Sequence, residues 1–467
     1  MSKKYFGTDG IRGEFGAEPL TENFFVLLGA AISKSLLRSK DCKKRILFGC
    51  DTRESSNKII NLISSGLSSE HCVLSNAGIV STPAIAFYTR KNKYDLGIVV
   101  SASHNLYHDN GIKIFNKNGF KISLEDENYI ENYIEKLFSE NYQCDKTEYN
   151  LIDVSKDIKK EYIESCLNTI SLDKNINNSI KLTLDLANGA NYIIGKEAFI
   201  EAGYKVNCCN DKPNGKNINA KCGSTYLKDL PEQIKLDDSK YGISMDGDGD
   251  RIVIIDKHNN ILDGDDILYT IVRGKIINNE KVSGLVGTTM TNIALENYLK
   301  NNGIDFVRSN VGDKYVLSEM RKFNYDLGGE TSGHILMLNH STSGDSIIAA
   351  LQFLFYSDIL DKNKINTILE KYPQKITNIF FKQDLPDNII DIVIKEASDR
   401  FSDNELRLII RKSGTENCIR IMVEAKNIDI VDEKSMDIKE YIENRLKTLL
   451  WRKLLLQIGK IMEVKNL

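Results

Sequence analysis

The sequence lacks the features that would direct it to a membrane or to nucleic acid. Its 467 residues carry a formal net charge of −3, so no general electrostatic attraction to nucleic acid or anionic lipid is expected. The longest early apolar run, Phe24 to Ile32, is well short of the ~20 residues that a membrane helix needs. Residues Met1 to Gly10 lack the apolar core of a signal peptide. We therefore expect a cytoplasmic protein that binds neither nucleic acid nor membrane.

Paired cysteines are also missing. The nine cysteines are scattered, odd in number and without a Cys-x-x-Cys pair, which argues against a disulfide framework or a zinc ribbon. The chain is longer than one ordinary domain, so about two to four domains are expected. With 41% hydrophobic and 27% charged residues, its composition is that of a globular protein.

Apolar runs typical of strands alternate with helical patterns along most of the chain. A helical stretch is expected at 22–37, a short buried strand at 45–49, and further strands at 96–100, 180–185 and 283–289. This order predicts an α/β fold with mostly parallel sheets.

The two ends of the chain predict other structures. Tyr5 to Gly13 is too rich in glycine for a helix or a long strand, and we expect a loop that carries Arg12. From Tyr372 the runs become shorter, which predicts a smaller α+β domain. A long helix over 436–462 is expected to pack on that last domain. After the strand at 45–49, either of the adjacent serines Ser55 and Ser56 could cap the next helix.

An acidic loop, Met245-Asp-Gly-Asp-Gly-Asp-Arg251, follows one apolar run and leads into another. Three carboxylates at alternate positions, separated by glycines, can converge on a single hard cation. Arg251 adds a cation beside them, which suits a site that also binds phosphate. An acidic hairpin turn has the same pattern, because Asp-Gly pairs between hydrophobic runs are common in turns. The loop by itself does not decide between a metal site and a turn.

A serine-containing segment, Ser101-Ala-Ser-His-Asn105, follows the strand expected at 96–100. The carboxyl ends of parallel strands are where α/β folds place their ligand chemistry. The hydroxyl of Ser103 beside the imidazole of His104 suggests a nucleophile. Neighbouring strand residues point to opposite faces, however, so the two need not form a pair. A polar turn in which side chains cap backbone groups is the alternative.

Two later segments offer polar groups for a sugar phosphate. Gly328 to His334 contains a carboxylate, a hydroxyl and an imidazole, which suit vicinal sugar hydroxyls. Arg411 to Arg420 brackets a Ser-Gly-Thr turn with arginines, so hydroxyls, amides and guanidinium groups can bind one phosphate dianion. The first of these segments is also compatible with an ordinary strand-connecting loop. A second acidic stretch from Asp263 precedes a helical pattern and predicts a helix N-cap.

Four segments therefore present matching chemistry in one order along the chain, and this order resembles the α-D-phosphohexomutase superfamily. The resemblance extends from Tyr5 to about Glu424. Its motifs are the serine segment, the acidic loop, the Gly-Glu-Thr-Ser-Gly-His segment and Arg411-Lys-Ser-Gly-Thr-Glu416. Within the superfamily the phosphoglucosamine mutase branch is the most similar, since Phe6 to Gly13 and Val311-Gly-Asp313 also resemble that branch.

The resemblance implies an α/β fold of four domains around a central cleft. Three would be topologically related α/β units with mixed, mostly parallel sheets, and the fourth a smaller α+β domain. The expected limits are 1–157 for the serine-loop domain, 158–257 for the metal-loop domain, 258–370 for the sugar-loop domain and 371–467 for the phosphate-binding domain.

The resemblance also implies a role for individual residues. The implied catalytic residues are Ser103, Arg12, His104, Lys113, Arg251 and His334. One Mg²⁺ would be held by Ser103, in its phosphorylated form, with Asp246, Asp248 and Asp250. The implied substrate-binding residues are Glu330, Ser332, Arg411, Ser413, Gly414, Thr415 and Arg420. Lys113 and His334 are both candidates for proton transfer, and the sequence does not choose between them.

The implied activity is an isomerase that interconverts glucosamine 6-phosphate and glucosamine 1-phosphate for UDP-N-acetylglucosamine synthesis. It would use phosphoserine at Ser103 and glucosamine 1,6-bisphosphate as intermediate and activator. A phosphomannomutase or phosphoglucomutase is one alternative, and a catalytically weak phosphosugar-binding protein is another. A homodimer is left open.

Two positions depart from the family pattern. Leu106 and Asn417 stand where proline is usual, so both loops lose a fixed φ and reduced rigidity is expected.

Overall fold

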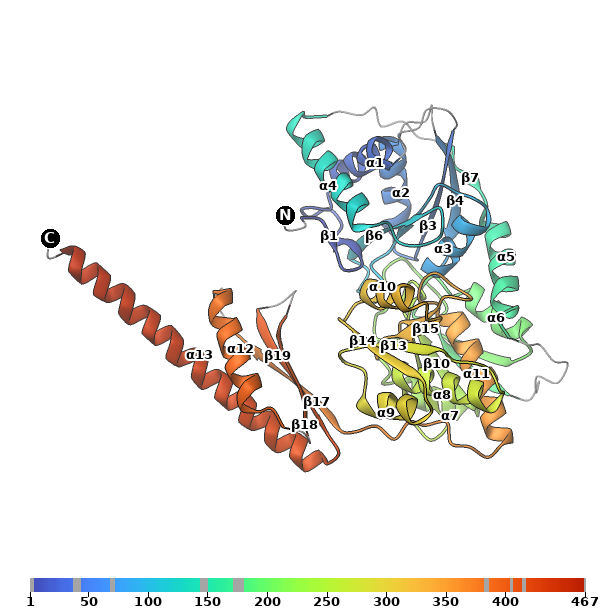
Figure 1. The fold of residues 1–467 in the computed structure, drawn as a ribbon. Coiled ribbons are helices and arrows are strands. Elements are labelled where there is room, and N and C mark those ends of the chain that lie inside the picture. Colours follow the sequence, from blue (N-terminus) through green and yellow to red (C-terminus); the bar gives the residue numbers. More distant parts are fainter. Residues whose placement is uncertain are drawn as a thin grey trace. The chain divides into compact units, whose positions relative to one another are not determined.

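The computed structural model describes residues 4–36, 43–67, 72–142, 150–170, 180–381, 386–403, 406–413 and 417–465, with the side chains of 450–465 not described. These residues form two compact units, described separately here (Figure 1). Unit 1 consists of Met1–Thr291 and Tyr298–Leu369, and unit 2 of Asn292–Asn297 and Glu370–Leu467.

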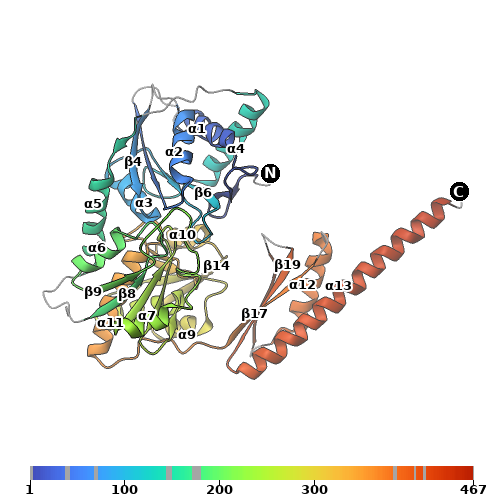
Figure 2. The same cartoon turned by 180° about the vertical axis from the view of Figure 1, so that it is seen from behind.

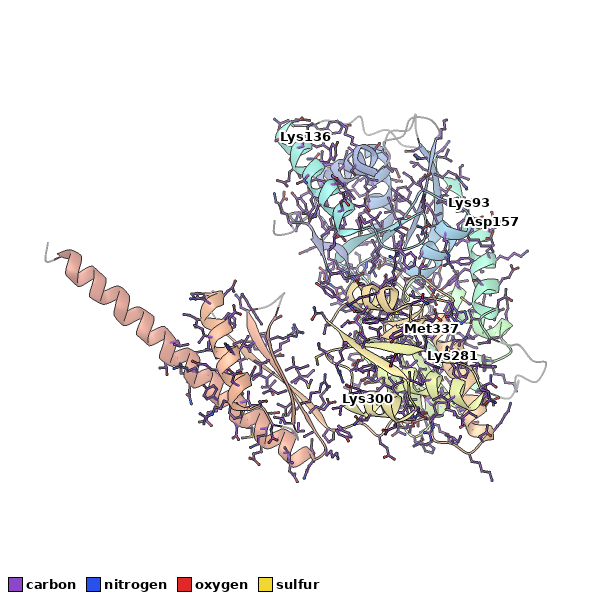
Figure 3. The ribbon with its side chains drawn as sticks, viewed as in Figure 1. Lys93, Lys136, Asp157, Lys281, Lys300 and Met337 are labelled. Atoms are coloured by element: carbon purple, nitrogen blue, oxygen red, sulfur yellow. The ribbon has the colours of Figure 1, made fainter. Side chains whose placement is uncertain are left out.

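A seven-stranded mixed sheet begins unit 1, with strand order β1-β2-β6-β5-β3-β4-β7. Helices α1, α2 and α4 pack together, and α3 packs against α5; Figure 3 labels Lys93 and Asp157 on the α3 and α5 side. The strands are β1 (Phe6–Gly7), β2 (Gly10–Glu14), β3 (Lys44–Cys50), β4 (Cys72–Ile79), β5 (Leu96–Val100), β6 (Asp109–Asn116) and β7 (Ile152–Asp153). The helices are α1 (Glu22–Leu36), α2 (Ser56–Gly66), α3 (Thr82–Lys91), α4 (Leu124–Ser139) and α5 (Ser155–Leu167).

The glycine-rich opening is a hairpin, so the expectation of a loop from Tyr5 to Gly13 is wrong. Strands β1 and β2 pair with each other, and β2 continues antiparallel along β6. Ile11 is fully buried, and its burial favours the strand. Gly10 allows the pairing because its φ is +80° and a Cβ there would lie 2.3 Å from the Ile112 carbonyl oxygen.

Ser55, at the N-cap position of α2, and Ser56, the first residue of that helix, use their side chains for contacts other than a cap. The Ser55 backbone is helical rather than extended, and its side chain makes no capping hydrogen bond. Its hydroxyl instead accepts a hydrogen bond from Asn110 Nδ2 at 2.7 Å. The hydroxyl of Ser56 donates to Asp51 at 3.3 Å. Ser55 therefore ties the start of the helix to β6, and Ser56 ties it to Asp51 after β3.

The second sheet of unit 1 has five strands in the order β12-β11-β10-β8-β9. Helix α6 of this second unit packs against α5 of the first (Figure 2), and this contact connects the two units on one side. The strands are β8 (Lys181–Asp185), β9 (Lys205–Cys209), β10 (Tyr241–Met245), β11 (Ile252–Asp256) and β12 (Ile261–Leu262), and the helices are α6 (Ile194–Glu201) and α7 (Leu230–Asp237).

The third sheet has four strands in the order β14-β13-β15-β16. Helix α8 begins with a capping box in which Asp263 and Asp266 bond each other's backbone, as expected from the sequence. The strands are β13 (Gly284–Thr288), β14 (Asp305–Ser309), β15 (Leu327–Gly329) and β16 (Ile335–Met337). The helices are α8 (Gly264–Ile277), α10 (Asp313–Phe323) and α11 (Ser346–Lys362). Helix α9 (Ile293–Asn301) follows β13 in the chain, and its residues up to Asn297 belong to unit 2.

One arrangement recurs in all three sheets. Each sheet contains a row of four adjacent strands, of which the first three are parallel and the fourth is antiparallel to the third. The rows are β4-β3-β5-β6, β9-β8-β10-β11 and β14-β13-β15-β16. The serine segment joins β5 to β6, the acidic loop joins β10 to β11, and the Gly329–His334 segment joins β15 to β16. The three segments thus occupy equivalent positions in three related units.

Unit 2 contains an antiparallel sheet of order β17-β19-β18, with α12 and α13 packed against the sheet and each other. Val431, Ile438 and Ile442 of α13 are buried in its core, so the terminal helix packs on the last domain as expected. The elements are β17 (Gln374–Phe380), α12 (Asp387–Arg400), β18 (Leu406–Lys412), β19 (Cys418–Ala425) and α13 (Ile428–Lys465).

No helix in the described ranges is long and apolar enough to cross a membrane. The domain limits expected at 157/158, 257/258 and 370/371 stay a prediction, and the first of them falls within the first turn of α5.

Candidate active site

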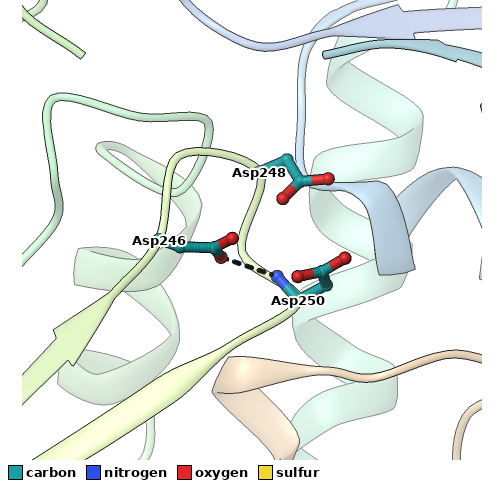
Figure 4. Close-up of side chains that lie close together, drawn as sticks. All are labelled: Asp246, Asp248 and Asp250. Carbon is teal, nitrogen blue, oxygen red and sulfur yellow. Dashed lines mark hydrogen bonds between the residues drawn. The ribbon is translucent and has the colours of Figure 1, made fainter. Parts of the chain in front are cut away.

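The acidic loop gathers three buried carboxylates at one point. Ligand atoms from Asp246, Asp248 and Asp250 lie within 4.8 Å of one another (Figure 4). Asp246 Oδ1 accepts the backbone N–H groups of Asp250 and Arg251, both at 3.1 Å, and Gly249 turns the chain at a φ of +73°. The connection is a hairpin, as the turn interpretation required, but its carboxylates point inward rather than to solvent.

A divalent cation fits this cluster. Asp248 Oδ1 and Asp250 Oδ1 are buried and have no hydrogen-bond partner among the described residues. Burial, followed by the charges of Asp250 and Asp248, holds the pKa of Asp246 well above its usual range. Buried acceptors without partners are costly, and a hard cation with oxygen ligands would satisfy them. The donor set is the one that Mg²⁺ prefers.

The Ser103 hydroxyl meets this cluster directly. Its Oγ donates to Asp246 Oδ2 at 2.7 Å, although the two residues are 143 positions apart. Ser103 is fully buried, and its φ of +53° is unusual for a residue with a side chain. The segment is a turn rather than a strand, and the question of whether Ser103 and His104 lie together is answered by their distance: His104 Nδ1 lies 3.4 Å from Ser103 Oγ. Burial, with the charges of Arg251 and Arg12, lowers the pKa of His104 to about 4.

Three cations surround the carboxylates. Lys113, from β6, is 1% exposed and donates to Asp248 at 2.7 Å and to Asp250 at 2.8 Å. Burial favours the neutral amine, but the neighbouring carboxylates keep the pKa of Lys113 well above its usual value. Arg12 donates to the Ala102 carbonyl oxygen at 2.6 Å, and Arg251 Nε lies 3.9 Å from Asp250. The site thus holds positive charge where a phosphoryl group would need it.

The third loop adds an imidazole and a carboxylate. His334 Nδ1 lies 3.7 Å from Asp250 Oδ1, and its Nε2 lies 3.9 Å from Asp313 Oδ2. Burial lowers the pKa of His334, but Asp250, with Asp313 and Glu330, outweighs it and the net shift is upward. Glu330 is buried and accepts the backbone N–H of Gly312 at 2.9 Å. Ser332 is exposed.

An ion-pair network behind the site was not anticipated from the sequence. Asp9 bonds Arg12 and Lys121 and lies 3.1 Å from Lys113. Lys121 also donates to Asp313 at 2.5 Å, which joins the first α/β unit to α10. Asp9 lies inside the Phe6–Gly13 segment that carries the family resemblance, and this position could have marked it as a site residue. Nothing in the sequence marks Lys121, which acts through partners far along the chain.

In unit 2 the two predicted arginines face each other. Arg411 of β18 is the register partner of Arg420 of β19, so both guanidinium groups arise at one end of the hairpin. Ser413 follows, is buried, and donates its backbone N–H to the Cys418 carbonyl oxygen at 2.9 Å. Gly414 and Thr415 lie outside the described residues.

Comparison with known proteins decides the family. Four models of the phosphoglucomutase/phosphomannomutase family match in order: α/β/α domain I at residues 3–141, domain II at 160–260, domain III at 263–376 and the C-terminal domain at 366–440. The chain belongs to this family. It is an α/β protein of three related units and a C-terminal domain, and the predicted fold class is confirmed in these features.

Two similar relatives are named phosphoglucosamine mutase. The chain is 37% identical over 437 residues to a phosphoglucosamine mutase of Neisseria meningitidis serogroup A, covering 92% of this chain and 96% of that one. It is 38% identical over 447 residues to the phosphoglucosamine mutase of Nitrosococcus oceani, covering 95% and 98%. A crystal structure of a family protein from Burkholderia thailandensis shares the fold with a TM-score of 0.77 at 19% identity, covering 95% and 98%.

Proposed function

We propose that this family member is a phosphoglucosamine mutase, an isomerase acting on glucosamine 6-phosphate and glucosamine 1-phosphate. The contact between Ser103 Oγ and Asp246, at 2.7 Å, carries the proposal. It joins a nucleophilic hydroxyl to a cluster suited to a cation, which is what phosphoryl transfer through a phosphoserine requires. The names of the relatives favour glucosamine over glucose or mannose.

In the proposed reaction, Ser103 carries a phosphoryl group. The bond from phosphorus to Ser103 Oγ breaks as a bond forms to the free hydroxyl oxygen of the substrate, whose proton passes to a base. The resulting 1,6-bisphosphate turns over. The bond from its other phosphorus to the sugar oxygen then breaks as a bond forms to Ser103 Oγ, and the released sugar oxygen takes up a proton. A Mg²⁺ held by Asp246, Asp248, Asp250 and a phosphoserine oxygen would neutralise charge on the transferred group. Arg12, Lys113 and Arg251 would stabilise the same group from the protein side.

Of the two proton-transfer candidates, His334 has the better support. Lys113 is engaged with two carboxylates of the cluster, and its raised pKa favours retention of its proton. His334 Nε2 is buried without a hydrogen-bond partner among the described residues, so it has a lone pair or a proton to offer a sugar hydroxyl. We assign His104, neutral beside Ser103, to orientation of the serine hydroxyl.

Sugar and phosphate recognition would use the other predicted residues. Glu330 and Ser332 would bind sugar hydroxyls, and the non-reacting phosphate would bind at the end of the β18–β19 hairpin. The proposed phosphate ligands are Arg411, Ser413, Gly414, Thr415 and Arg420. The seven described cysteines are free thiols, which supports a reducing, cytoplasmic compartment.

The test is detection of the phosphoenzyme. Incubation with glucosamine 1,6-bisphosphate should add one phosphate to the wild-type protein by intact mass and none to Ser103→Ala, with turnover lost in parallel. Absence of phosphate on wild-type protein would contradict the mutase mechanism and leave a phosphosugar-binding protein. Turnover is then compared on glucosamine, glucose and mannose phosphates, and a marked preference for mannose would exclude the proposed substrate.

A further inference from the structure

The turn that carries Ser103 needs support from its surroundings. A φ of +53° is disfavoured for any residue with a side chain, so the turn does not hold this shape on its own. Position 106, at the end of the turn, is leucine, whose φ no ring restrains. Yet the direction of Ser103 Oγ, and hence its contact with Asp246, depends on this backbone.

Arg53, from the loop after β3, lies under the turn and is bonded to its carbonyl oxygens. Its side chain is fully buried. Nη2 donates to the carbonyl oxygens of Ser103 at 3.2 Å and Asn105 at 2.8 Å, and Nη1 donates to that of Leu106. A buried guanidinium that binds three carbonyl groups of one short turn restricts every peptide plane that it touches.

Asn219 binds the same turn from the second α/β unit. Its Nδ2 donates to the Ser103 carbonyl oxygen at 2.8 Å and to that of Asn105 at 2.9 Å. Asn219 is itself buried and held by a backbone hydrogen bond to Ala187 at 2.9 Å. Two side chains from loops of different α/β units therefore converge on the same two carbonyl groups.

Asp51 fixes the other side of this arrangement. It accepts Arg53 Nε at 2.8 Å, which sets the plane of the guanidinium, and it accepts the Ser101 hydroxyl at 2.5 Å. The Ser101 hydroxyl in turn accepts the backbone N–H of Ser103 at 2.9 Å. The N–H and the C=O of Ser103 are thus both tied, through one or two steps, to the Asp51–Arg53 pair.

We propose that Arg53, together with Asn219, is a positioning residue for phosphoryl transfer: it holds the serine turn so that Ser103 Oγ faces the carboxylate cluster. The inference rests on the proposed mutase function. Neither side chain touches the reacting atoms, and neither belongs to the groups proposed to bind sugar or phosphate. Their loss should therefore lower kcat while KM for the sugar phosphate changes little.

The first test is Arg53→Lys, which keeps the charge but cannot reach all three carbonyl groups with one ammonium. We expect kcat and the single-turnover rate of Ser103 phosphorylation to fall roughly 10- to 100-fold, since ångström-scale misplacement has effects of this size. KM should stay within about 3-fold. Arg45→Lys is the matched control, because Arg45 also donates to a backbone carbonyl group, that of Asn92 at 2.7 Å, but away from the site. Wild-type kcat in Arg53→Lys would overturn the proposal.

Two further variants separate positioning from folding. Arg53→Ala should regain phosphorylation rate when guanidinium ion is added at concentrations well below those that unfold the protein, and failure of a folded variant to respond would count against the proposal. Asn219→Gly removes the amide while tolerating the φ of +56° at that position, and it should lower kcat in the same way. If Arg53 variants do not fold, unchanged kcat in Asn219→Gly overturns the proposal. If the wild-type protein itself does not become phosphorylated on Ser103, the mutase function is refuted rather than the positioning role.

Discussion

Gly247 lies where the acidic loop meets the serine turn, and Gly247→Ala tests whether that contact governs the reaction rate. A Cβ at this position would lie 2.6 Å from the Ser103 carbonyl oxygen and 2.6 Å from Asn219 Nδ2. The φ of Gly247 is not positive, so alanine brings no backbone strain and the effect is purely steric. The acidic loop has little room to move away from the serine turn, because Gly189 packs closely against Gly247 on another side. A Cβ added at Gly189 would lie only 2.5 Å from the Gly247 carbonyl oxygen.

The size of the effect follows from these distances. Cβ contacts below 3.0 Å essentially do not occur, so the two loops must separate by a few tenths of an ångström. Because a misplacement of about 1 Å in an active site lowers a rate by roughly 100-fold, we expect kcat to fall about 10-fold.

The assay is steady-state turnover of glucosamine phosphates at saturating Mg²⁺, with intact mass to follow Ser103 phosphorylation and a thermal melt to confirm folding. Gly7→Ala is the control, because the nearest atom to its added Cβ is the Gly10 carbonyl oxygen at an ordinary 3.4 Å. A folded Gly247→Ala protein with kcat within about 2-fold of wild type would refute the argument that this contact sets the position of Ser103.

Three further predictions concern charge and helix capping. Lys113→Met leaves buried carboxylates without their cation, so the free energy of unfolding should fall by roughly 3–5 kcal/mol without Mg²⁺. Added Mg²⁺ should then stabilise the variant more than wild type in denaturant titrations, and an equal gain would contradict this assignment. Burial raises the pKa of Asp345 from 3.8 to about 6, so the folded protein keeps a proton there that the unfolded chain releases. The free energy of unfolding that Asp345 contributes therefore decreases as pH rises from about 4 to about 6. In Asp345→Asn this decrease should be smaller by roughly 3 kcal/mol. Equal dependence of stability on pH in the two proteins would disprove the assignment. Asp263→Ala removes the cap of α8 and should lower the free energy of unfolding by about 1 kcal/mol at unchanged kcat, measured by urea unfolding.

Local sequence predicted the regular elements well where pattern and burial agree. The strand expected at 96–100 is β5, and the helix expected at 22–37 is α1, Glu22–Leu36. Prediction was wrong where a residue's role depends on distant partners. Ser55 has the right side chain for an N-cap, but Asn110 binds its hydroxyl instead. The hairpin at Gly10 depends on the close approach of Ile112, about one hundred positions away.

The sequence by itself determined which chemical groups are present and in what order: a serine turn, three alternating aspartates, a carboxylate–imidazole loop and an arginine-flanked turn. These are local patterns, and resemblance of their order to a family was enough to predict the reaction. The same resemblance implied that Ser103 and Asp246 share one cation. Only the tertiary structure gave the geometry of their meeting, a hydrogen bond of 2.7 Å between residues 143 positions apart. It also decided that Arg53 and Asn219 donate to carbonyl groups of the serine turn and that Lys121 pairs with Asp9 and Asp313, contacts that the local sequence does not specify. The physical reason is that their partners are backbone carbonyl groups and carboxylates brought together by the packing of separate sheets, and that packing leaves no local signal in the sequence.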